Sequence, residues 1–374
     1  MKLPELKIGN LIAKLPIIQG GMGVGISMAG LASAVANEGG IGVISSVGLG
    51  SANDTKAKNH WESNKIALRE EIRKAKKLTK GIIGVNIMMA LTDYAELVKI
   101  SLEEADIVFI GAGLPLRLPK NISFDFVKSV KAKIVPIVSS ARAAKIIFKS
   151  WEKNYSHIPD AVVVEGPLAG GHLGFKQSQI DDPAYKLENL IPEVVSAIKP
   201  FIQKFAKKIP VIAAGGIFNG VDIHKFLNLG ADGVQLGTRF VATHECDADI
   251  KFKNEYIRAK KEDIVIIKSP VGLPGRAVFN KFLSDVEQGI KKPFKCDWQC
   301  LKTCNFRTTL YCIAQALLNS KIGKLSDGFS FAGANAYRID KIISVKELMD
   351  TLVAEYEKVA FLVNQNPALA TNNL

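Results

Sequence analysis

The sequence predicts an α/β fold, a (β/α)8 TIM barrel followed by a C-terminal, partly helical extension. Three observations lead to this prediction. Short runs rich in Val and Ile recur eight times before residue 242. They are apolar almost throughout rather than alternating, which is typical of parallel strands covered on both faces. Helical segments lie between them, and this alternation favours a closed barrel, with an open doubly wound sheet as the main competitor.

The predicted elements follow one another in regular order. We expect strands at Pro16–Ile18, Ile41–Ser45, Ile82–Ile87, Ile107–Ile110, Ile134–Val138, Ala161–Val164, Val211–Ala214 and Gly233–Leu236. We expect helices at Met28–Asn37, Glu62–Lys77, Asp93–Glu103, Ala141–Lys153, Pro192–Lys207 and Val221–Leu229. Ser27 and Thr92 are the predicted N-caps of the first and third helices, because short hydroxyl side chains accept the unpaired N–H groups there.

The chain divides into three predicted parts. Residues 1–242 form the barrel core, and residues 243–330 form an inserted, lid-like extension that carries a cysteine cluster. Residues 331–374 contribute a strand and a helix, Val345–Val363, that pack back on the barrel and end in a frayed polar tail.

Composition excludes several classes of protein. The net charge of +13 comes from 49 Lys and Arg against 36 Asp and Glu, but the lysines are scattered among acids. Without a recognition motif this pattern argues against nucleic-acid binding and favours an anionic cofactor or substrate. No run approaches the ~18 apolar residues of a membrane helix, and no signal peptide is evident, so we expect a cytoplasmic protein. Homodimerisation stays open.

Glycine-rich loops follow several predicted strands, where a barrel places its working groups. Gly20, Gly21 and Met22 follow the first strand, and glycines there let the backbone approach a flat ligand. Asn86 ends the third strand among apolar residues, and its amide needs a partner if it is buried. The alternatives are an ordinary tight turn and an amide satisfied by neighbouring backbone.

The last two strands predict a phosphate site. Gly215 and Gly216 follow the seventh strand, and Gly237 and Thr238 follow the eighth. Loops seven and eight form the recurrent phosphate site of this fold, through backbone amides. The Thr238 hydroxyl adds one further hydrogen bond.

One loop combines glycines with an imidazole. The segment from Glu165 through Gly170 and Gly171 to His172 leaves the sixth strand. Histidine exchanges protons near neutral pH, so we interpret His172 as catalytic rather than structural. The other four histidines lack such a setting, and we interpret them as solvated or core residues.

Four cysteines lie close together in the extension, at Cys296, Cys300, Cys304 and Cys312. If that segment is helical, a spacing of four places the first three along one helix face. Four thiolates suit zinc or an iron–sulfur cluster, but the usual C-x₂-C pairs are absent. A reduced thiol patch is the favoured alternative, and the sequence leaves the choice open.

Together these motifs resemble the nitronate monooxygenase (2-nitropropane dioxygenase-like) family, which includes the FMN-dependent enoyl-acyl-carrier-protein reductases. PIIQGGM, GVNIMM, EGPLAGGHLG, PVIAAGGI and GVQLGTRF match its signatures in order, and SPVGLPGR and FAGANAYR look like later elements. The resemblance implies that FMN contacts Gly20, Gly21, Met22, Asn86, Glu165, Gly170, Gly171, Gly215, Gly216, Gly237 and Thr238. Leu168 stands where the family often has an acid, and shorter members lack the cysteine-bearing extension.

The resemblance implies redox chemistry next to His172. The first hypothesis is oxidation of alkyl nitronates by O₂ to a carbonyl compound and nitrite, with FMN as cofactor. The alternative is an NAD(P)H-dependent reductase of enoyl thioesters or quinones, which suits the basic charge. The third is a flavin-binding redox sensor without catalysis that uses the cysteines as its switch.

Overall fold

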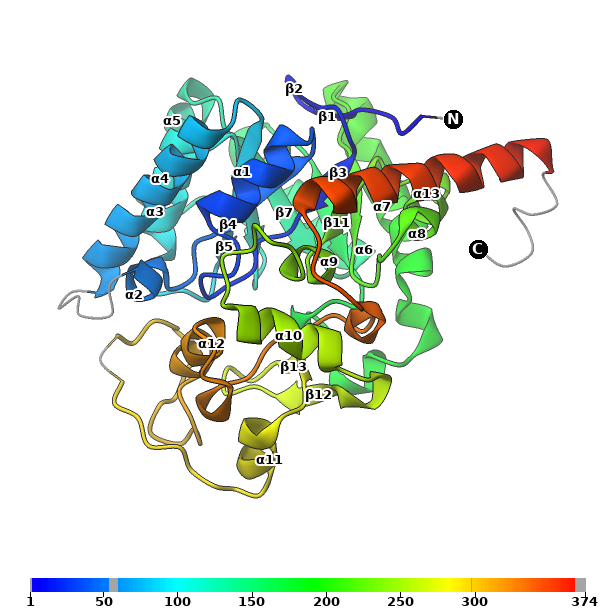
Figure 1. Cartoon of the computed structure of the whole chain (residues 1–374). Coiled ribbons are helices and arrows are strands. Elements are labelled where there is room, and N and C mark those ends of the chain that lie inside the picture. The colour runs from blue at the N-terminus through cyan, green and yellow to red at the C-terminus, as the bar shows by residue number, and fades with distance from the viewer. Residues whose placement is uncertain (1, 54–59, 297, 367–374) are drawn as a thin grey trace.

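The computed structural model describes residues 2–53, 60–296 and 298–366, and its centre is a closed barrel of eight parallel strands (Figure 1). Around the barrel the strand order is β10-β11-β3-β4-β5-β6-β7-β8. The strands are β3 (Ile17–Gln19), β4 (Ile41–Ser45), β5 (Ile82–Met88), β6 (Ile107–Gly111), β7 (Lys133–Val138), β8 (Val162–Glu165), β10 (Val211–Ala214) and β11 (Gly233–Leu236). The predicted barrel is confirmed, and each predicted strand end lies within one residue of the observed one.

Helices surround the barrel and connect its strands (Figure 1). They are α1 (Ala29–Asn37), α2 (Leu49–Asn53), α3 (His60–Leu78), α4 (Tyr94–Glu104), α5 (Phe124–Ser129), α6 (Ala141–Tyr155), α7 (Leu187–Phe205), α8 (Gly220–Asn228) and α9 (Thr238–Val241). Helix α6 shows why they form, because Ala144, Ile147, Phe148 and Trp151 recur at helical spacing and are buried. Its exposed positions are mostly charged, with Arg142, Lys145 and Lys149 among them.

Both predicted N-caps are wrong. The Ser27 hydroxyl accepts the N–H of Met22 at 2.8 Å instead of capping α1. The carboxylate of Asp247 accepts the N–H groups of Met28 and Leu31, at 2.9 and 3.2 Å. Thr92 donates to the carbonyl of Gln299, and no side chain caps α4 at its start. At α1 a carboxylate of the distant extension therefore replaces the local cap, and at α4 the extension takes the Thr92 hydroxyl without supplying another cap.

Apolar side chains fill the barrel interior, among them Ile18, Val43, Phe109, Val163 and Ile212. The sequence did not predict the hairpin of β1 (Leu6–Ile8) and β2 (Leu11–Ala13), whose apolar residues join this interior cluster. In Figure 1 the hairpin lies at the end of the barrel opposite the extension. It closes that end, so ligands enter from the other.

The extension comprises α10 (Ile250–Arg258), β12 (Ile264–Lys268), β13 (Pro274–Val278), α11 (Lys281–Glu287) and α12 (Ile313–Lys321). Strand β13 pairs with β9 (Gly171–His172), so a three-stranded sheet joins the extension to the loop after β8. Helix α13 (Val345–Gln365) packs against α8 and α1. Within the described part of residues 331–366 there are isolated bridges but no sheet strand. The three-part division stays a prediction, and the frayed tail from residue 367 lies outside the described residues.

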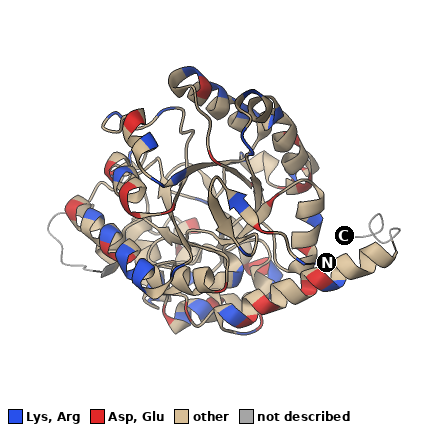
Figure 2. Cartoon of the chain, turned by 90° about the horizontal axis from the view of Figure 1, so that it is seen from above, with Lys and Arg blue, Asp and Glu red and all other residues tan. Residues whose placement is uncertain are grey.

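Charged residues of both signs are interspersed along the outer helices (Figure 2). Ion pairs such as Arg73–Glu104 and Lys207–Asp160 link neighbouring helices and loops. None of the helices in the described ranges combines the length and apolarity that crossing a bilayer requires.

Candidate active site

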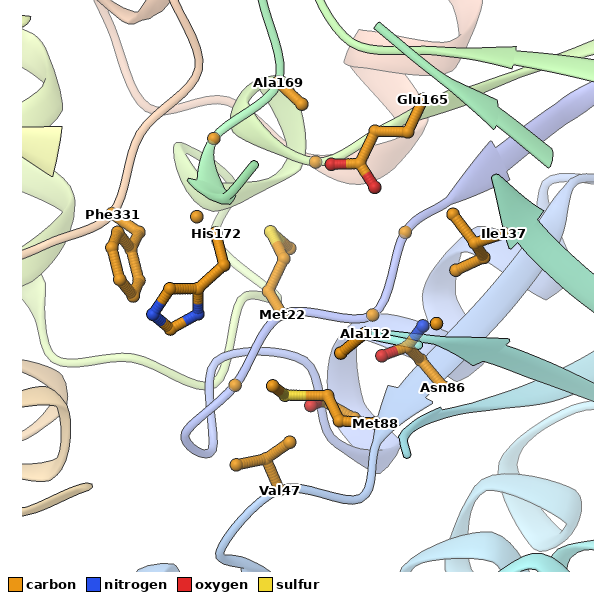
Figure 3. A pocket seen from close by; sticks show the side chains of 18 of the residues that line it. Met22, Val47, Asn86, Met88, Ala112, Ile137, Glu165, Ala169, His172 and Phe331 are labelled. Carbon is orange, nitrogen blue, oxygen red and sulfur yellow. The ribbon is translucent and has the colours of Figure 1, made fainter. Parts of the chain in front are cut away.

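A cavity of about 570 Å³ lies over the carboxyl ends of the barrel strands. All of the residues predicted for the site line it, and the extension contributes further lining residues. Figure 3 shows Asn86, Glu165 and His172 around this space, together with Met22. The barrel thus brings together side chains that are far apart in the sequence.

The loops after β10 and β11 form a cradle of backbone amides. Gly215 and Gly216 have positive φ angles of 93° and 88°, which glycine adopts most readily. A Cβ on Gly215 would lie 2.9 Å from the carbonyl oxygen of Gly166. Within the described residues, the N–H groups of Gly215, Gly216 and Gly237 donate to no protein acceptor. These unpaired donors suit an anionic group such as a phosphate.

Thr238 completes the cradle in a way that the sequence did not reveal. Its hydroxyl oxygen accepts the N–H of Gly333 at 2.9 Å. The hydroxyl hydrogen is therefore free to donate to a ligand, as the phosphate prediction requires. Gly333 belongs to the FAGANAYR segment, which brings the end of the chain against the cradle.

The loop after β3 leaves room for a flat group beside Asn86. A Cβ on Gly21 would come within 2.4 Å of the Cβ of Asn86, so only glycine fits there. The Asn86 amide borders the cavity and bonds to no other residue of the described chain. An amide offers both a donor and an acceptor, which matches the polar edge of an isoalloxazine ring.

Glu165 ends β8 and borders the same cavity. Burial raises the pKa of its carboxyl to about 7. No cation and no hydrogen-bond donor of the described residues pairs with it. The carboxyl is therefore easily protonated, and in that form it can donate a hydrogen bond to a ligand.

His172 is held between the loop after β8 and the extension. Its Nε2 lies 2.7 Å from the Ser269 hydroxyl, and its ring meets Phe331 edge to face at 5.0 Å. Burial lowers the pKa of the imidazole to about 4, so the ring is neutral near pH 7. The sequence did not single out Ser269, although it begins the SPVGLPGR motif that the family resemblance had marked.

A buried arginine fixes this loop. Arg276 is 5% exposed, and its guanidinium donates to the carbonyls of Pro167 and Ala169, the latter at 2.8 Å. Its backbone pairs with Gly171 in the β13–β9 ladder. Both contacts hold the glycine-rich segment that carries His172. Arg276 was also missed from sequence, because its contacts lie more than 100 residues away.

The cysteine segment is irregular rather than helical, so the first three thiols do not share a helix face. Cys312 is the N-cap residue of α12, and Cys300 borders the cavity. Burial, and then the proximity of the other three thiols, raises the pKa of Cys300 to about 12. No group of three or more His, Cys, Asp or Glu in the described ranges is arranged as a metal site. The choice between metal ligands and a thiol patch stays a hypothesis that iron and zinc analysis tests.

The chain is similar to known proteins both in sequence and in fold. The family model described as nitronate monooxygenase matches residues 5–355. A solved structure titled FabK from Thermotoga maritima superposes with a TM-score of 0.71 at 26% identity, covering 94% of this chain and 95% of that one.

Two curated relatives carry different names. A "probable nitronate monooxygenase" of Staphylococcus aureus is 27% identical over 308 residues, covering 74% of this chain and 79% of the relative. The "(3aS,4S,5R,7aS)-5-hydroxy-7a-methyl-1-oxo-octahydro-1H-indene-4-carboxyl-CoA dehydrogenase" of Mycobacterium tuberculosis is 29% identical over 274 residues. That match covers 73% of this chain and 66% of the relative, slightly less than two thirds of its length. The names of family and relatives indicate an oxidoreductase, and the match along residues 5–355 shows that the chain belongs to the nitronate monooxygenase family.

Proposed function

We propose that the chain is an FMN-dependent oxidoreductase that removes hydrogen from an acyl thioester. One observation carries the proposal: a neutral imidazole and a cradle of unpaired backbone amides border the same cavity. The cradle suits a cofactor phosphate, and the imidazole suits proton transfer from a substrate carbon.

The residues present fit FMN. Gly215, Gly216, Gly237 and Thr238 would hold its phosphate, and the glycines leave space that a Cβ would fill. Asn86 and Glu165 would contact the polar edge of the ring, and both lack other partners in the described chain. When bound, the cofactor supplies the two-electron redox chemistry of the reaction.

The protonation state of His172 bears on the choice between dehydrogenation and reduction. A neutral imidazole can accept the proton on the carbon next to a thioester carbonyl, and a group with a pKa of about 4 is unprotonated near pH 7. The hydride from the adjacent carbon would pass to the flavin, and an electron acceptor from solution would reoxidise the flavin. The lowered imidazole pKa therefore supports dehydrogenation as the first candidate, ahead of the reduction of an enoyl thioester by NAD(P)H.

The cavity wall favours a long apolar substrate. On the side of His172, its lining beyond the cofactor cradle includes Ile137, Leu173, Leu273 and Phe331. A short alkyl nitronate would leave most of these side chains without a partner, whereas an acyl chain would cover them. The carboxyl-CoA dehydrogenase among the similar proteins supports an acyl thioester as the substrate class.

Nitronate oxidation is the second candidate, and the family match favours it. Starting from a neutral nitroalkane, the same neutral imidazole would remove the proton next to the nitro group, whereas a nitronate supplied as such needs no base. The two reactions therefore differ in substrate length and in their demand on His172.

Anaerobic mixing tests the proposal. The flavin-loaded protein is mixed separately with a decanoyl thioester, with a propyl nitronate and with NADPH, and the flavin absorbance is followed. We expect the decanoyl thioester to bleach the flavin fastest. Bleaching by the nitronate alone would support the second candidate, and bleaching by NADPH alone would support the reductase that the sequence also suggested.

A further inference from the structure

A second polar cluster borders the cavity, away from the predicted cofactor site. Ser51 lies on α2, and His60 and Asn64 lie on α3; they are 3%, 8% and 3% exposed. Helix α2 follows β4, which is four strands from β8 in the closed ring of eight. The cluster therefore lies on the side of the barrel opposite the strand that precedes His172. From the sequence alone, His60 is interpreted only as a solvated or core residue.

The hydrogen bonds of this cluster determine the orientation of the Asn64 amide and the ring nitrogen of His60 that carries the proton. The Asn64 Oδ1 accepts the N–H of Gly50 at 2.9 Å, which sets the orientation of the amide. The Nδ2 group must then donate both of its hydrogens, to Asp93 Oδ2 at 3.0 Å and to His60 Nε2 at 3.2 Å. Because Nε2 accepts, the proton of the neutral ring lies on Nδ1.

That proton fixes the role of Ser51. The His60 Nδ1 lies 3.1 Å from the Ser51 oxygen and donates to it. The Ser51 hydroxyl hydrogen is then left without an acceptor in the described chain. Trp298 stacks on the His60 ring at 4.7 Å with an interplanar angle of 7°, which holds the ring in place. The cluster thus presents one oriented, unused donor at the cavity wall.

The charges around the cavity select the kind of acceptor. No Lys or Arg of the described residues lines it, whereas the acids Asp93 and Glu165 do. A buried carboxylate or phosphate near Ser51 would have neither a cation nor unpaired backbone amides to offset its desolvation, because the N–H groups of Gly50, Ser51 and Ala52 already donate within the protein. An uncharged oxygen, such as the carbonyl of an amide, meets no such cost.

We propose that the Ser51 hydroxyl binds an uncharged carbonyl oxygen in the part of the substrate remote from the reacting carbon. The inference rests on the proposed acyl-thioester function. The reacting carbon would lie near His172, and a hydrocarbon acyl chain has no second carbonyl. The carbonyl at Ser51 would therefore be an amide of the arm that carries the sulfur. The Ser51 site therefore selects amide-bearing thioesters over simple alkyl ones.

Isotope-edited infrared spectroscopy tests this contact on the flavin-loaded protein. The probe is N-(2-acetamidoethyl)decanamide, an unreactive amide analogue of the thioester, labelled with ¹³C either at the acetyl or at the decanoyl carbonyl. In the wild-type protein we expect the acetyl band at the lower frequency of a hydrogen-bonded amide. In Ser51→Ala it should move toward its value in an apolar solvent, while the decanoyl band stays unchanged.

Binding constants provide a second readout. A neutral hydrogen bond contributes about 0.5–1.5 kcal/mol, so Ser51→Ala should weaken probe binding about 2- to 12-fold. Ser51→Thr, which keeps the hydroxyl, should restore both affinity and band position. Ser46→Ala is the matched control, because Ser46 is fully buried nearby, has no hydrogen-bond partner for its hydroxyl and does not line the cavity.

The outcomes separate this inference from the proposed function, since the probe binds without turnover. An acetyl band that already has its apolar-solvent value in the wild-type protein would overturn the Ser51 contact, whether or not Ser51→Ala folds. A response of the decanoyl band alone would overturn the remote placement. Failure of thioesters to bleach the flavin would instead count against the dehydrogenation, and would leave a Ser51-dependent acetyl band intact as evidence of binding.

Discussion

At the scale of single residues, burial in one cavity shifts the pKa values of two ionisable groups in opposite directions. It lowers the pKa of His172 to about 4 and raises that of Glu165 to about 7. Burial disfavours the charged form in both cases, so the imidazole loses its proton easily and the carboxyl keeps one. The cavity therefore combines a neutral base with a carboxyl that can act as a donor.

Replacing His172 by Asn should remove proton transfer while keeping the approximate shape. We expect kcat to fall about 10²- to 10⁴-fold, the usual contribution of a general base. Flavin content should stay at the wild-type level, because the cradle lies on other loops. In the wild-type enzyme kcat/KM should be constant above pH 5 and fall as pH drops through about 4. A wild-type profile that instead falls near pH 6.5 would contradict the lowered imidazole pKa.

Glu165→Gln should change stability in a pH-dependent way. The folded-state pKa is raised, so wild-type stability is fully present below the ordinary value of 4.5 and is lost as pH rises through about 7. Glutamine mimics the neutral carboxyl, so the variant should match the wild type at pH 4 and exceed it at pH 8 by about 1–3 kcal/mol. Urea unfolding of the flavin-free protein measures this. If the variant and the wild type had the same free energy of unfolding at both pH values, the pKa of the Glu165 carboxyl would not be raised.

At the scale of elements, the strands and helices follow from sequence because their signals are local. Continuous apolar runs identify β4 and β10 to the residue, and helical spacing identifies α6. The N-cap prediction for α1 is wrong because the carboxylate of Asp247, far along the chain, accepts N–H groups that a local hydroxyl was expected to accept. The pairing of β13 with β9 could not be predicted from the sequence either, because it depends on how the extension folds over the barrel.

Arg276 connects the extension to the barrel, because it lies on β13 and binds the loop after β8. Arg276→Lys keeps the charge, but the shorter side chain leaves its ammonium short of the position from which Nη1 of Arg276 donates to both Pro167 and Ala169. We expect kcat to fall at least about tenfold, as small displacements of catalytic groups commonly cost that much. We also expect a loss of about 1–3 kcal/mol in unfolding free energy, from a buried acceptor left unpaired.

The control for this substitution is Arg258→Lys, on the exposed surface of α10, which should leave both quantities unchanged. Steady-state kinetics and urea unfolding test the pair together. Wild-type kcat in Arg276→Lys would show that the loop needs no guanidinium to hold His172.

At the scale of the whole molecule, the cavity exists because the extension covers an open barrel end. The hairpin β1–β2 closes the other end, and residues of α12 such as Ile313 and Leu317 form part of the cavity wall. The cofactor-binding loops could be predicted from sequence because the barrel fixes where they meet. The substrate wall and the Ser51 cluster could not, because they combine segments whose separation along the chain carries no signal.

The proposed function requires that the loops after β10 and β11 hold a cofactor phosphate within reach of His172. Titration of the folded, flavin-free protein with FMN and with riboflavin tests it most directly, because the two ligands differ only in the phosphate. We predict one FMN bound per chain, at least about 100-fold more tightly than riboflavin, since charge-assisted hydrogen bonds contribute about 1.5–3 kcal/mol each. Equal affinity for the two, or no binding of either, would contradict the account.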